Sequence, residues 1–412
     1  MTGETTLNPA VAVVGAGPGG LTAARELAAS RSGQVLVLER NGQPGGAPHY
    51  SHQLGYGLRD LGRLLSGPGY ARQLAAAAHR AGAAIRTDAT VTGWVGERTL
   101  QVTTPQGLLH VQAQAVVLAT GARERPRPAR LVPGTRPAGV YTTGQLQRLV
   151  HAYRRFVGRH AVVVGADPVS WSAVLTLREA GAHTVLMTTE QQHLPAYSVA
   201  GRVLLRTPVA PGTRVVRILG ERTVEGVEVE DAAGGRRIVD CDCVVFTGDW
   251  VPEHELARSA RLELAAGSRS PSVDGALRTS RPGVFGAGDL LHPVATAGFA
   301  ALDGRHVARS VLAWLDGNAG PRESVRLVAE APLRWVTPTA VRPGDPPPPR
   351  GQLLAWTDEF RARPTVVVRQ GDAELTSRRL PRPAWPGRAV RVPAALLRAA
   401  DPTAGEVRIS LR

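Results

Sequence analysis

The sequence contains no lysine, so all 49 of its basic residues are arginines. This absence excludes phosphate-binding loops of the Walker A type and Schiff-base chemistry, because both need a lysine side chain. With 34 acidic residues the formal net charge is +15, a value that can indicate a nucleic-acid partner. The arginines are scattered along the chain and are not gathered in one block with aromatic residues between them. We therefore expect no nucleic-acid binding.

Cysteine is almost absent as well, since the chain has only Cys241 and Cys243. One Cys-x-Cys pair cannot complete a structural zinc site, and a disulfide between alternate residues of an extended strand has unsuitable geometry. We expect both thiols to be buried on the same face of one strand over residues 237–246. No other ligand residues have a spacing typical of a metal centre, and no Ser-His-Asp arrangement is evident, so we predict no metal site.

Long apolar runs are also missing, although 43% of the 412 residues are hydrophobic. We therefore expect no membrane span and two or three globular domains. Residues 1–8 lack the basic and then apolar pattern of a signal peptide, which predicts a cytoplasmic location.

The most informative stretch is Val11–Gly20, an apolar strand that leads into Gly15-x-Gly17-x-x-Gly20 and a helix over residues 21–29. Gly15 permits a tight turn, Gly17 lets the backbone approach a pyrophosphate, and Gly20 lets helix and strand pack closely. A second strand, residues 34–38, ends at Glu39, where a carboxylate typically binds a ribose hydroxyl. This order of parts predicts a dinucleotide site at the start of the helix.

The same order of parts recurs later in the chain. Residues 160–165 predict a strand that ends at Gly165, residues 170–180 a helix, and residues 183–188 a second strand followed by Glu190. This motif is degenerate, because Asp167 and Ser170 replace the second and third glycines. Asp167 would put a carboxylate where a pyrophosphate approaches, and Ser170 adds bulk at the contact between helix and strand.

With both units and the late Gly286-Ala-Gly288-Asp289, residues 11–316 resemble the two-dinucleotide-domain flavoproteins, which include the pyridine nucleotide–disulfide oxidoreductases. The resemblance implies an α/β fold with a Rossmann-like FAD domain in residues 1–125 and 251–320 and an inserted, NAD(P)-type Rossmann-like domain in residues 126–250. Residues 321–412 would form a proline-rich linker, mostly residues 338–350, and a small C-terminal β domain that folds separately from about residue 323. Its strands are expected at residues 353–356, 365–369, 389–392 and 406–411.

The resemblance also assigns roles to residues near the expected FAD. Asp289 would hold the ribitol, the helix predicted at residues 295–315 would point its N-terminus at the flavin ring, and the backbone of Val91 would meet adenine. The residues expected to bind FAD are Gly15, Ala16, Gly17, Pro18, Gly19, Gly20, Glu39, Arg40, Gly45, Gly46, Val91, Thr120, Gly121, Gly288 and Asp289.

The chain departs from this group in two respects. Gly45-Gly46 is followed by Ala-Pro-His instead of a redox cysteine pair, so thiol–disulfide exchange is not expected. The degenerate motif, with Gly165, Asp167 and Ser170, predicts weak or absent NAD(P) binding.

A closer likeness is to the FAD-binding subunits of hydrogen cyanide synthase, opine oxidase and amine or proline dehydrogenases, through Pro133-Gly134 and Gly139–Gly144. It implies an FAD-dependent dehydrogenase for a small polar metabolite (an amine, an amino acid or a hydroxy acid), which could work with a partner dehydrogenase subunit. Two alternatives stay open: an NAD(P)H-dependent flavin reductase or monooxygenase, and a non-catalytic electron-relay subunit. His49, His52 and His292 are the candidate catalytic residues, because histidine exchanges protons near neutral pH.

Overall fold

The computed structural model describes residues 5–31, 33–293, 296–320 and 323–412, and the chain divides into two compact units. Unit 1 comprises Met1–His49, Leu54–Ala122 and Pro252–Arg412. Unit 2 comprises Tyr50–Gln53 and Arg123–Val251, so it is inserted into unit 1 in sequence. Within the described ranges, no helix has both the length and the apolar character needed to cross a membrane.

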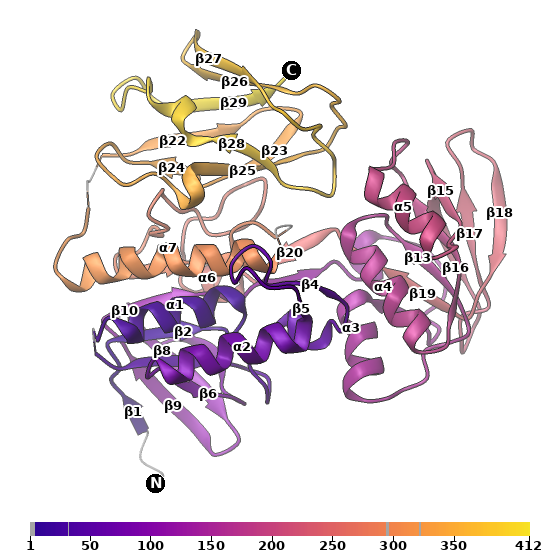
Figure 1. Ribbon diagram of the computed structural model, residues 1–412, viewed down its shortest axis with the longest axis horizontal. Helices are drawn as coiled ribbons and strands as arrows, with labels where there is room; N and C mark the ends of the chain where they lie inside the picture. The colour runs from indigo at the N-terminus through magenta and orange to yellow at the C-terminus, as the bar shows by residue number, and fades with distance from the viewer. Residues whose placement is uncertain (1–4, 32, 294–295, 321–322) are drawn as a thin grey trace. The chain divides into compact units, whose positions relative to one another are not determined.

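Unit 1 is built around a parallel sheet with the strand order β21-β10-β2-β3-β6. Figure 1 labels β2, β6 and β10 of this sheet. The strands are β2 (Val11–Val14), β3 (Val35–Leu38), β6 (Ala84–Arg86), β10 (Ala115–Leu118) and β21 (Val284–Gly286). Every residue of β2, β3, β10 and β21 is buried, as expected for the continuous apolar strands of a parallel sheet that is covered on both faces.

Alternate residues of these strands face two different layers. Val11 and Val13 pack against three helices, α1 (Pro18–Ala29), α2 (Gly67–Arg80) and α7 (Ala297–Leu315). Ala12 and Val14 pack against α6 (Glu255–Ser259) and the sheet β1-β9-β8-β7. The strands of that sheet are β1 (Thr5–Leu7), β7 (Thr90–Trp94), β8 (Thr99–Thr104) and β9 (Gly107–Gln112). Because successive side chains of a strand point to opposite faces, the parallel sheet is covered on both sides, and the domain has three layers. Helix α7 is described from Ala297; the predicted start at residue 295 lies outside the described residues.

Unit 2 repeats this three-layer arrangement. Its parallel sheet has the order β12-β19-β13-β14-β15. The strands are β12 (Val140–Thr142), β13 (His160–Val164), β14 (His183–Thr189), β15 (Val209–Pro211) and β19 (Cys243–Phe246). Helices α3 (Thr143–Gln147), α4 (Pro168–Glu179) and α5 (Ala196–Leu204) lie on the helical side, where Leu146, Trp171 and Leu177 are core residues. The sheet β16-β17-β18 covers the other face, with strands Arg214–Leu219, Gly226–Glu230 and Arg236–Asp240. The predicted fold class, with a second Rossmann-like domain inserted in the first, is confirmed.

The prediction that Cys241 and Cys243 share one face of one strand is wrong. The chain ends β18 at Asp240 and enters β19 at Cys243, and these strands belong to different sheets. Cys241 packs in the core between the two sheets, whereas Cys243 packs on the helical side of the parallel sheet. Both thiols are buried and free, as expected.

The C-terminal part of unit 1 consists of two β-sheets around a core of its own. One has the order β24-β22-β29-β26-β27 and the other β23-β25-β28. Their strands are β22 (Val325–Ala329), β23 (Leu333–Thr337), β24 (Ala340–Val341), β25 (Gln352–Thr357), β26 (Thr365–Gln370), β27 (Ala373–Arg379), β28 (Val390–Pro393) and β29 (Val407–Leu411). Phe299 of α7 packs with Trp335 and Leu354 in a further small core.

The proline-rich segment 338–350 is held in place by ion pairs to other parts of unit 1. Arg342 pairs with Asp274 at 2.6 Å, Arg350 pairs with Asp303 at 2.5 Å, and Asp345 pairs with Arg278. Each of these ion pairs joins the segment to a residue of unit 1 that precedes it in the sequence.

Short elements complete the described chain. They are β4 (Leu54–Tyr56), β5 (Leu65–Ser66), β11 (Ala122–Glu124), β20 (Trp250–Pro252), the 3₁₀ turns η1 (Ala47–Tyr50), η2 (Arg127–Arg130), η4 (Gly288–Leu290), η5 (Pro349–Gly351) and η6 (Ala394–Leu397), and the π-helical turn η3 (Arg148–Ala152).

Candidate functional site

The first glycine motif forms a tight turn between β2 and α1. Gly15 has φ +102°, its N–H donates to the carbonyl of Leu38 at 2.8 Å, and a Cβ there would lie 2.4 Å from the carbonyl oxygen of Ala119. A Cβ on Gly20 would lie 1.9 Å from the carbonyl oxygen of Gly15, so only glycine fits at either position. At Gly17 a Cβ would have nothing within 4 Å among the described residues, and this open space at the start of a helix fits a bound pyrophosphate.

Glu39 lies directly after β3 and is only 4% exposed. Its Oε2 accepts the backbone N–H of Ala16 at 2.8 Å, and its Oε1 accepts the backbone and side-chain N–H groups of Asn41 at 2.9 and 2.7 Å. The carboxylate is therefore fixed beside the glycine turn, as required of a group that binds ribose there.

Two further segments border the glycine turn. Gly45 donates to the carbonyl of Ala16 at 2.8 Å, and a Cβ on Gly46 would lie 2.9 Å from Cα of Gly17. Beyond the end of β10, Thr120 Oγ1 donates to the carbonyl of Glu253 at 2.7 Å, and Glu253 N donates to the carbonyl of Gly121 at 2.9 Å. Glu253 also pairs with Arg40 at 3.5 Å. Glu253 belongs to none of the sequence motifs, so its place beside the glycine turn was not predicted from the sequence.

Asp289 lies in η4, where Gly288 has φ +71° and Gly19 of α1 approaches closely. Its Oδ1 is buried and has no hydrogen-bond partner among the described residues. Burial raises the pKa of Asp289 to about 6; His292 opposes this effect and Asp303 adds to it. A buried acceptor without a donor fits the hydroxyl groups of a ribitol chain, so this structure supports the FAD assignment independently of the glycine motif.

His292 is 3% exposed and belongs to a buried charged network in unit 1. Its Nε2 hydrogen-bonds to Asp303 of α7, its Nδ1 lies 3.9 Å from Asp289 Oδ1, and Asp303 also binds Arg350. Burial alone lowers the pKa of His292, but the neighbouring carboxylates outweigh burial and raise it. His292 Nδ1 therefore faces Asp289 across 3.9 Å without a hydrogen bond to it.

A cluster of arginines surrounds Phe299, the third residue of α7. The guanidinium carbons of Arg59, Arg350 and Arg391 lie 4.3, 4.6 and 4.8 Å from the centre of the Phe299 ring. Arg59 also donates to Thr296 Oγ1 at 3.2 Å, immediately before α7 begins. We call these three arginines, together with Arg382 and Arg388, the arginine cluster.

Few carboxylates pair with the arginine cluster to balance its positive charge. Burial lowers the pKa of Arg391, and Arg59 and the other cluster members lower it further; burial and the same neighbours lower the pKa of Arg59. Within the part of the chain that the structure describes, Arg382, Arg388 and Arg391 form no ion pair. Like charges held this close repel one another, so an anion between them would be strongly favoured.

The two histidines after Gly46 belong to different units. His49 ends the unit 1 segment and lies in η1, whereas His52 belongs to unit 2. The ring of His52 stacks on that of His151, with the ring centres 3.7 Å apart. His49 therefore remains the candidate that shares a unit with the glycine motif.

The second glycine motif keeps the turn but changes its chemistry. Gly165 has φ +126° and donates to the carbonyl of Thr188 at 2.7 Å. Ser170 is fully buried; its Oγ accepts the N–H of Asp167 at 3.0 Å and lies 2.6 Å from Thr247 Oγ1. The bulk that Ser170 adds is thus accommodated through hydrogen bonds.

Buried carboxylates surround this second turn. Burial raises the pKa of Asp167 to about 6; Arg130 opposes this effect and Glu124 adds to it. Glu124 accepts the N–H groups of Gly144 and Gly248, each at 3.1 Å. Two carboxylates with one nearby arginine disfavour a bound pyrophosphate.

The remaining FAD candidate away from these turns is Val91. It lies in β7, where it is half-buried and pairs with Val102 of β8. β7 is an edge strand of its sheet, and the contact of Val91 with adenine stays a prediction from the resemblance.

Comparison with known proteins places this geometry in a family. The family described as "Pyridine nucleotide-disulphide oxidoreductase" matches residues 9–309, and the chain belongs to it. An opine oxidase subunit from Rhizobium meliloti is 30% identical over 341 residues, which cover 73% of this chain and 62% of that protein. The alpha subunit of sarcosine oxidase from Corynebacterium sp. (strain P-1) is 33% identical over 192 residues, which cover 42% of this chain and 18% of that protein.

The chain thus spans less than two thirds of the opine oxidase subunit that it matches. Among solved structures, the thioredoxin reductase of T. acidophilum superposes with a TM-score of 0.63 at 23% identity and covers 76% of this chain and 99% of that one. At this identity the likeness shows the shared fold alone.

Proposed function

Because the chain belongs to the pyridine nucleotide-disulphide oxidoreductase family and is an FAD-binding oxidoreductase, we propose that it is a dehydrogenase for a small metabolite that carries a carboxylate. The substrate class is an amino acid, a related amine or a hydroxy acid. The relatives named opine oxidase and sarcosine oxidase support this class. The observation that carries the proposal is the arginine cluster at the start of α7.

FAD, when bound, accepts the hydride or electrons of the substrate. The residues proposed to hold it are the glycine turn at Gly15–Gly20, Glu39 for the ribose, and Asp289 for the ribitol. His292 and Asp303 would keep Asp289 in place through their buried contacts.

The arginine cluster would bind the carboxylate of the substrate. By resemblance, the start of α7 faces the flavin ring, and Arg59 reaches Thr296 at that point. Guanidinium groups bind carboxylates through paired hydrogen bonds, and an anion here would relieve the repulsion among the arginines. His49 would take a proton from the amine or hydroxyl group of the substrate.

Two observations support chemistry without thiols. Burial raises the pKa of Cys241 and of Cys243 to about 12, so both remain protonated and unreactive at neutral pH. No cysteine follows Gly45-Gly46 in the sequence until Cys241.

We also propose that NAD(P) binds weakly or not at all at the second turn, because Asp167 and Glu124 present negative charge there. This weakens the alternative of an NAD(P)H-dependent reductase or monooxygenase. The alternative of an electron-relay subunit has one supporting observation: both relatives are named as subunits. The names of these relatives also support the proposal of a partner dehydrogenase subunit. We separately propose a cytoplasmic location.

The arginine cluster provides the test. We would follow the flavin absorbance of the oxidised holoprotein while titrating it with proline, sarcosine and lactate, and then repeat the titration with Arg59→Gln and Arg391→Gln. Arg408→Gln, in the same β region, is the matched control. We expect both cluster variants to keep FAD and to weaken binding of the active compound at least tenfold, with the control unchanged. Equal affinity for the active compound in the wild type and all three variants would show that the arginine cluster does not bind the substrate.

A further inference from the structure

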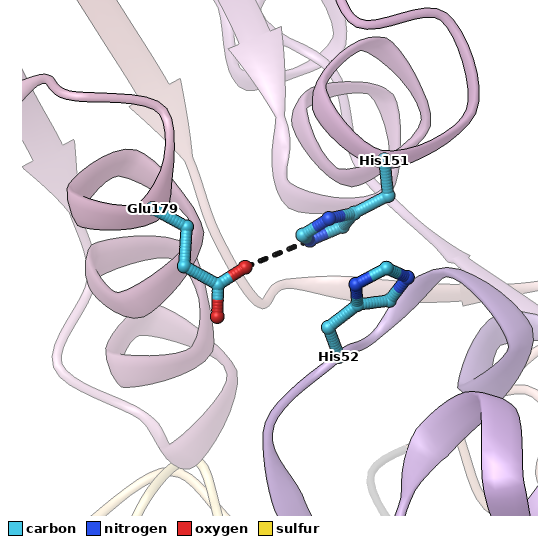
Figure 2. A group of neighbouring side chains, drawn as sticks. All are labelled: His52, His151 and Glu179. Carbon is cyan, nitrogen blue, oxygen red and sulfur yellow. Dashed lines mark ion pairs between the residues drawn. The ribbon is translucent and has the colours of Figure 1, made fainter.

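Unit 2 brings together three metal-binding side chains that are far apart in sequence: His52, His151 and Glu179 (Figure 2). His52 lies in the segment Tyr50–Gln53, His151 in the π-helical turn η3, and Glu179 at the last position of α4. Each offers one ligand atom, and these atoms all lie within 4.8 Å of one another. We propose that they form a binding site for a divalent transition-metal ion, with Zn²⁺ as the best-suited ion.

Binding of one ion by both imidazoles requires the stack of His52 on His151 to open, because the lone pairs of two nearly parallel rings point along nearly parallel planes. His151 Nε2 lies 3.7 Å from Glu179 Oε2, and Figure 2 shows the His52 ring stacked beneath that of His151. Ligand atoms around a tetrahedral zinc ion lie about 3.3 Å apart, as follows from metal–ligand bonds of about 2.0–2.1 Å. Closing this group onto an ion therefore needs rotation of the His52 side chain, which is exposed.

His151 places a ring nitrogen opposite the carboxylate of Glu179. Its Nε2 is buried and has no hydrogen-bond partner among the residues that the structure describes. A metal ion would satisfy this nitrogen and the facing carboxylate together.

Two imidazoles and one carboxylate are a known donor set for Zn²⁺, and three protein ligands leave a position for water. The two imidazole donors favour Zn²⁺ over Mg²⁺ or Ca²⁺, which prefer oxygen ligands. The π-helical turn that carries His151 is of a kind often found at functional sites.

A bound ion would fix the segment Tyr50–Gln53 to η3 and α4. Hydrogen bonds already hold this segment: Gln147 donates to Ser51 Oγ at 3.3 Å, and Gln53 donates to Ser172 Oγ at 2.6 Å. The metal would add a third and stronger link. The site is independent of the proposed oxidation chemistry and does not rest on it.

The test uses untagged holoprotein, first treated with a chelator and then titrated with Zn²⁺ by calorimetry. We expect one Zn²⁺ per chain, and at least tenfold weaker binding in His52→Ala, His151→Ala and Glu179→Gln. His183→Ala is the control, because His183 is an exposed histidine of the same unit, and it should bind Zn²⁺ like the wild type. Flavin content and far-ultraviolet circular dichroism report whether each variant has folded.

X-ray absorption at the zinc edge of the wild-type protein gives a readout that needs no variant. Two imidazole ligands and no sulfur ligand are expected. Zinc that is not retained at stoichiometric amount, zinc bound through sulfur, or equal binding in the three ligand variants and the wild type would each overturn the site.

Discussion

Units 1 and 2 share a parallel sheet with a glycine turn, but they differ in the chemistry of that turn. α1 and α4 each have 12 residues and begin at a proline, and Gly15 and Gly165 donate to the end of the neighbouring strand at 2.8 and 2.7 Å. Gly17 and Gly20 are replaced by Asp167 and Ser170 in the second unit. The backbone of the turn therefore needs only the first glycine, whereas the second glycine determines whether a phosphate can approach.

The acidic residues after the second strand of each unit differ in the same way. Glu39 is buried and binds the N–H of Ala16 in the turn, whereas Glu190 is exposed. In unit 1 the carboxylate is held ready for a ribose; in unit 2 it faces solvent. This difference agrees with our proposals that unit 1 binds FAD and that unit 2 binds NAD(P) weakly or not at all.

The largest effect that would test this comparison is expected from Gly17→Leu. Gly17 has extended backbone with φ −77° and free space around it, so the variant should fold, but its side chain would fill the position of the pyrophosphate. We expect FAD affinity to fall at least about 100-fold. Flavin content after gel filtration measures it. Gly144→Ala, at an exposed glycine of unit 2 with equal space, is the control; a yellow Gly17→Leu protein would contradict the assignment.

Restoring the glycines of the second motif should strengthen the binding of NAD⁺. This gain should be smaller than the loss of FAD affinity expected from Gly17→Leu. The double change Asp167→Gly, Ser170→Gly removes the carboxylate and the added bulk, so affinity for NAD⁺ should rise about tenfold over wild type. Isothermal calorimetry measures the change. A wild-type dissociation constant in the low micromolar range would show that the native turn already binds the dinucleotide.

The ionisation of Asp167 predicts a pH dependence. Because burial raises its pKa to about 6, the carboxyl group is mostly ionised at pH 8 and mostly neutral at pH 5. The neutral form repels phosphate less, so residual NAD⁺ binding should strengthen as the pH falls through about 6. The same titration with Asp167→Asn should be nearly flat; an equally steep profile in that variant would assign the dependence to another group.

The smallest effect is expected from the cysteines. Both thiols are buried and protonated, so Cys241→Ala, Cys243→Ala should leave the rate of flavin reduction by the organic substrate within about twofold. Stopped-flow absorbance under anaerobic conditions measures this rate. A loss of reduction in the folded, flavin-loaded double variant would restore thiol chemistry as a candidate mechanism.

Much of the fold could be predicted because its signals are local. The two glycine turns and the Gly-x-Gly-Asp at 286–289 each combine a buried strand with a turn in a few residues. The face of Cys241 was not predictable, because a two-residue crossing between two sheets leaves the same apolar pattern as one strand.

The sites built from distant residues could not be predicted. Arg59 and Arg391 are two of 49 arginines and meet at Phe299 only after the C-terminal β region has folded onto α7. His52, His151 and Glu179 come from a loop, a π-helical turn and a helix end, and their spacing matches no metal motif. Tertiary packing alone brings each set together.

The most direct test of the central claim is the reduction of the bound flavin under anaerobic conditions. Holoprotein is mixed separately with NADH, with NADPH and with amino and hydroxy acids that carry a carboxylate, and the loss of flavin absorbance is recorded. We predict rapid bleaching by a member of the carboxylate group and little bleaching by either nicotinamide cofactor. Rapid bleaching by NADH or NADPH, with none by any organic acid, would contradict the account.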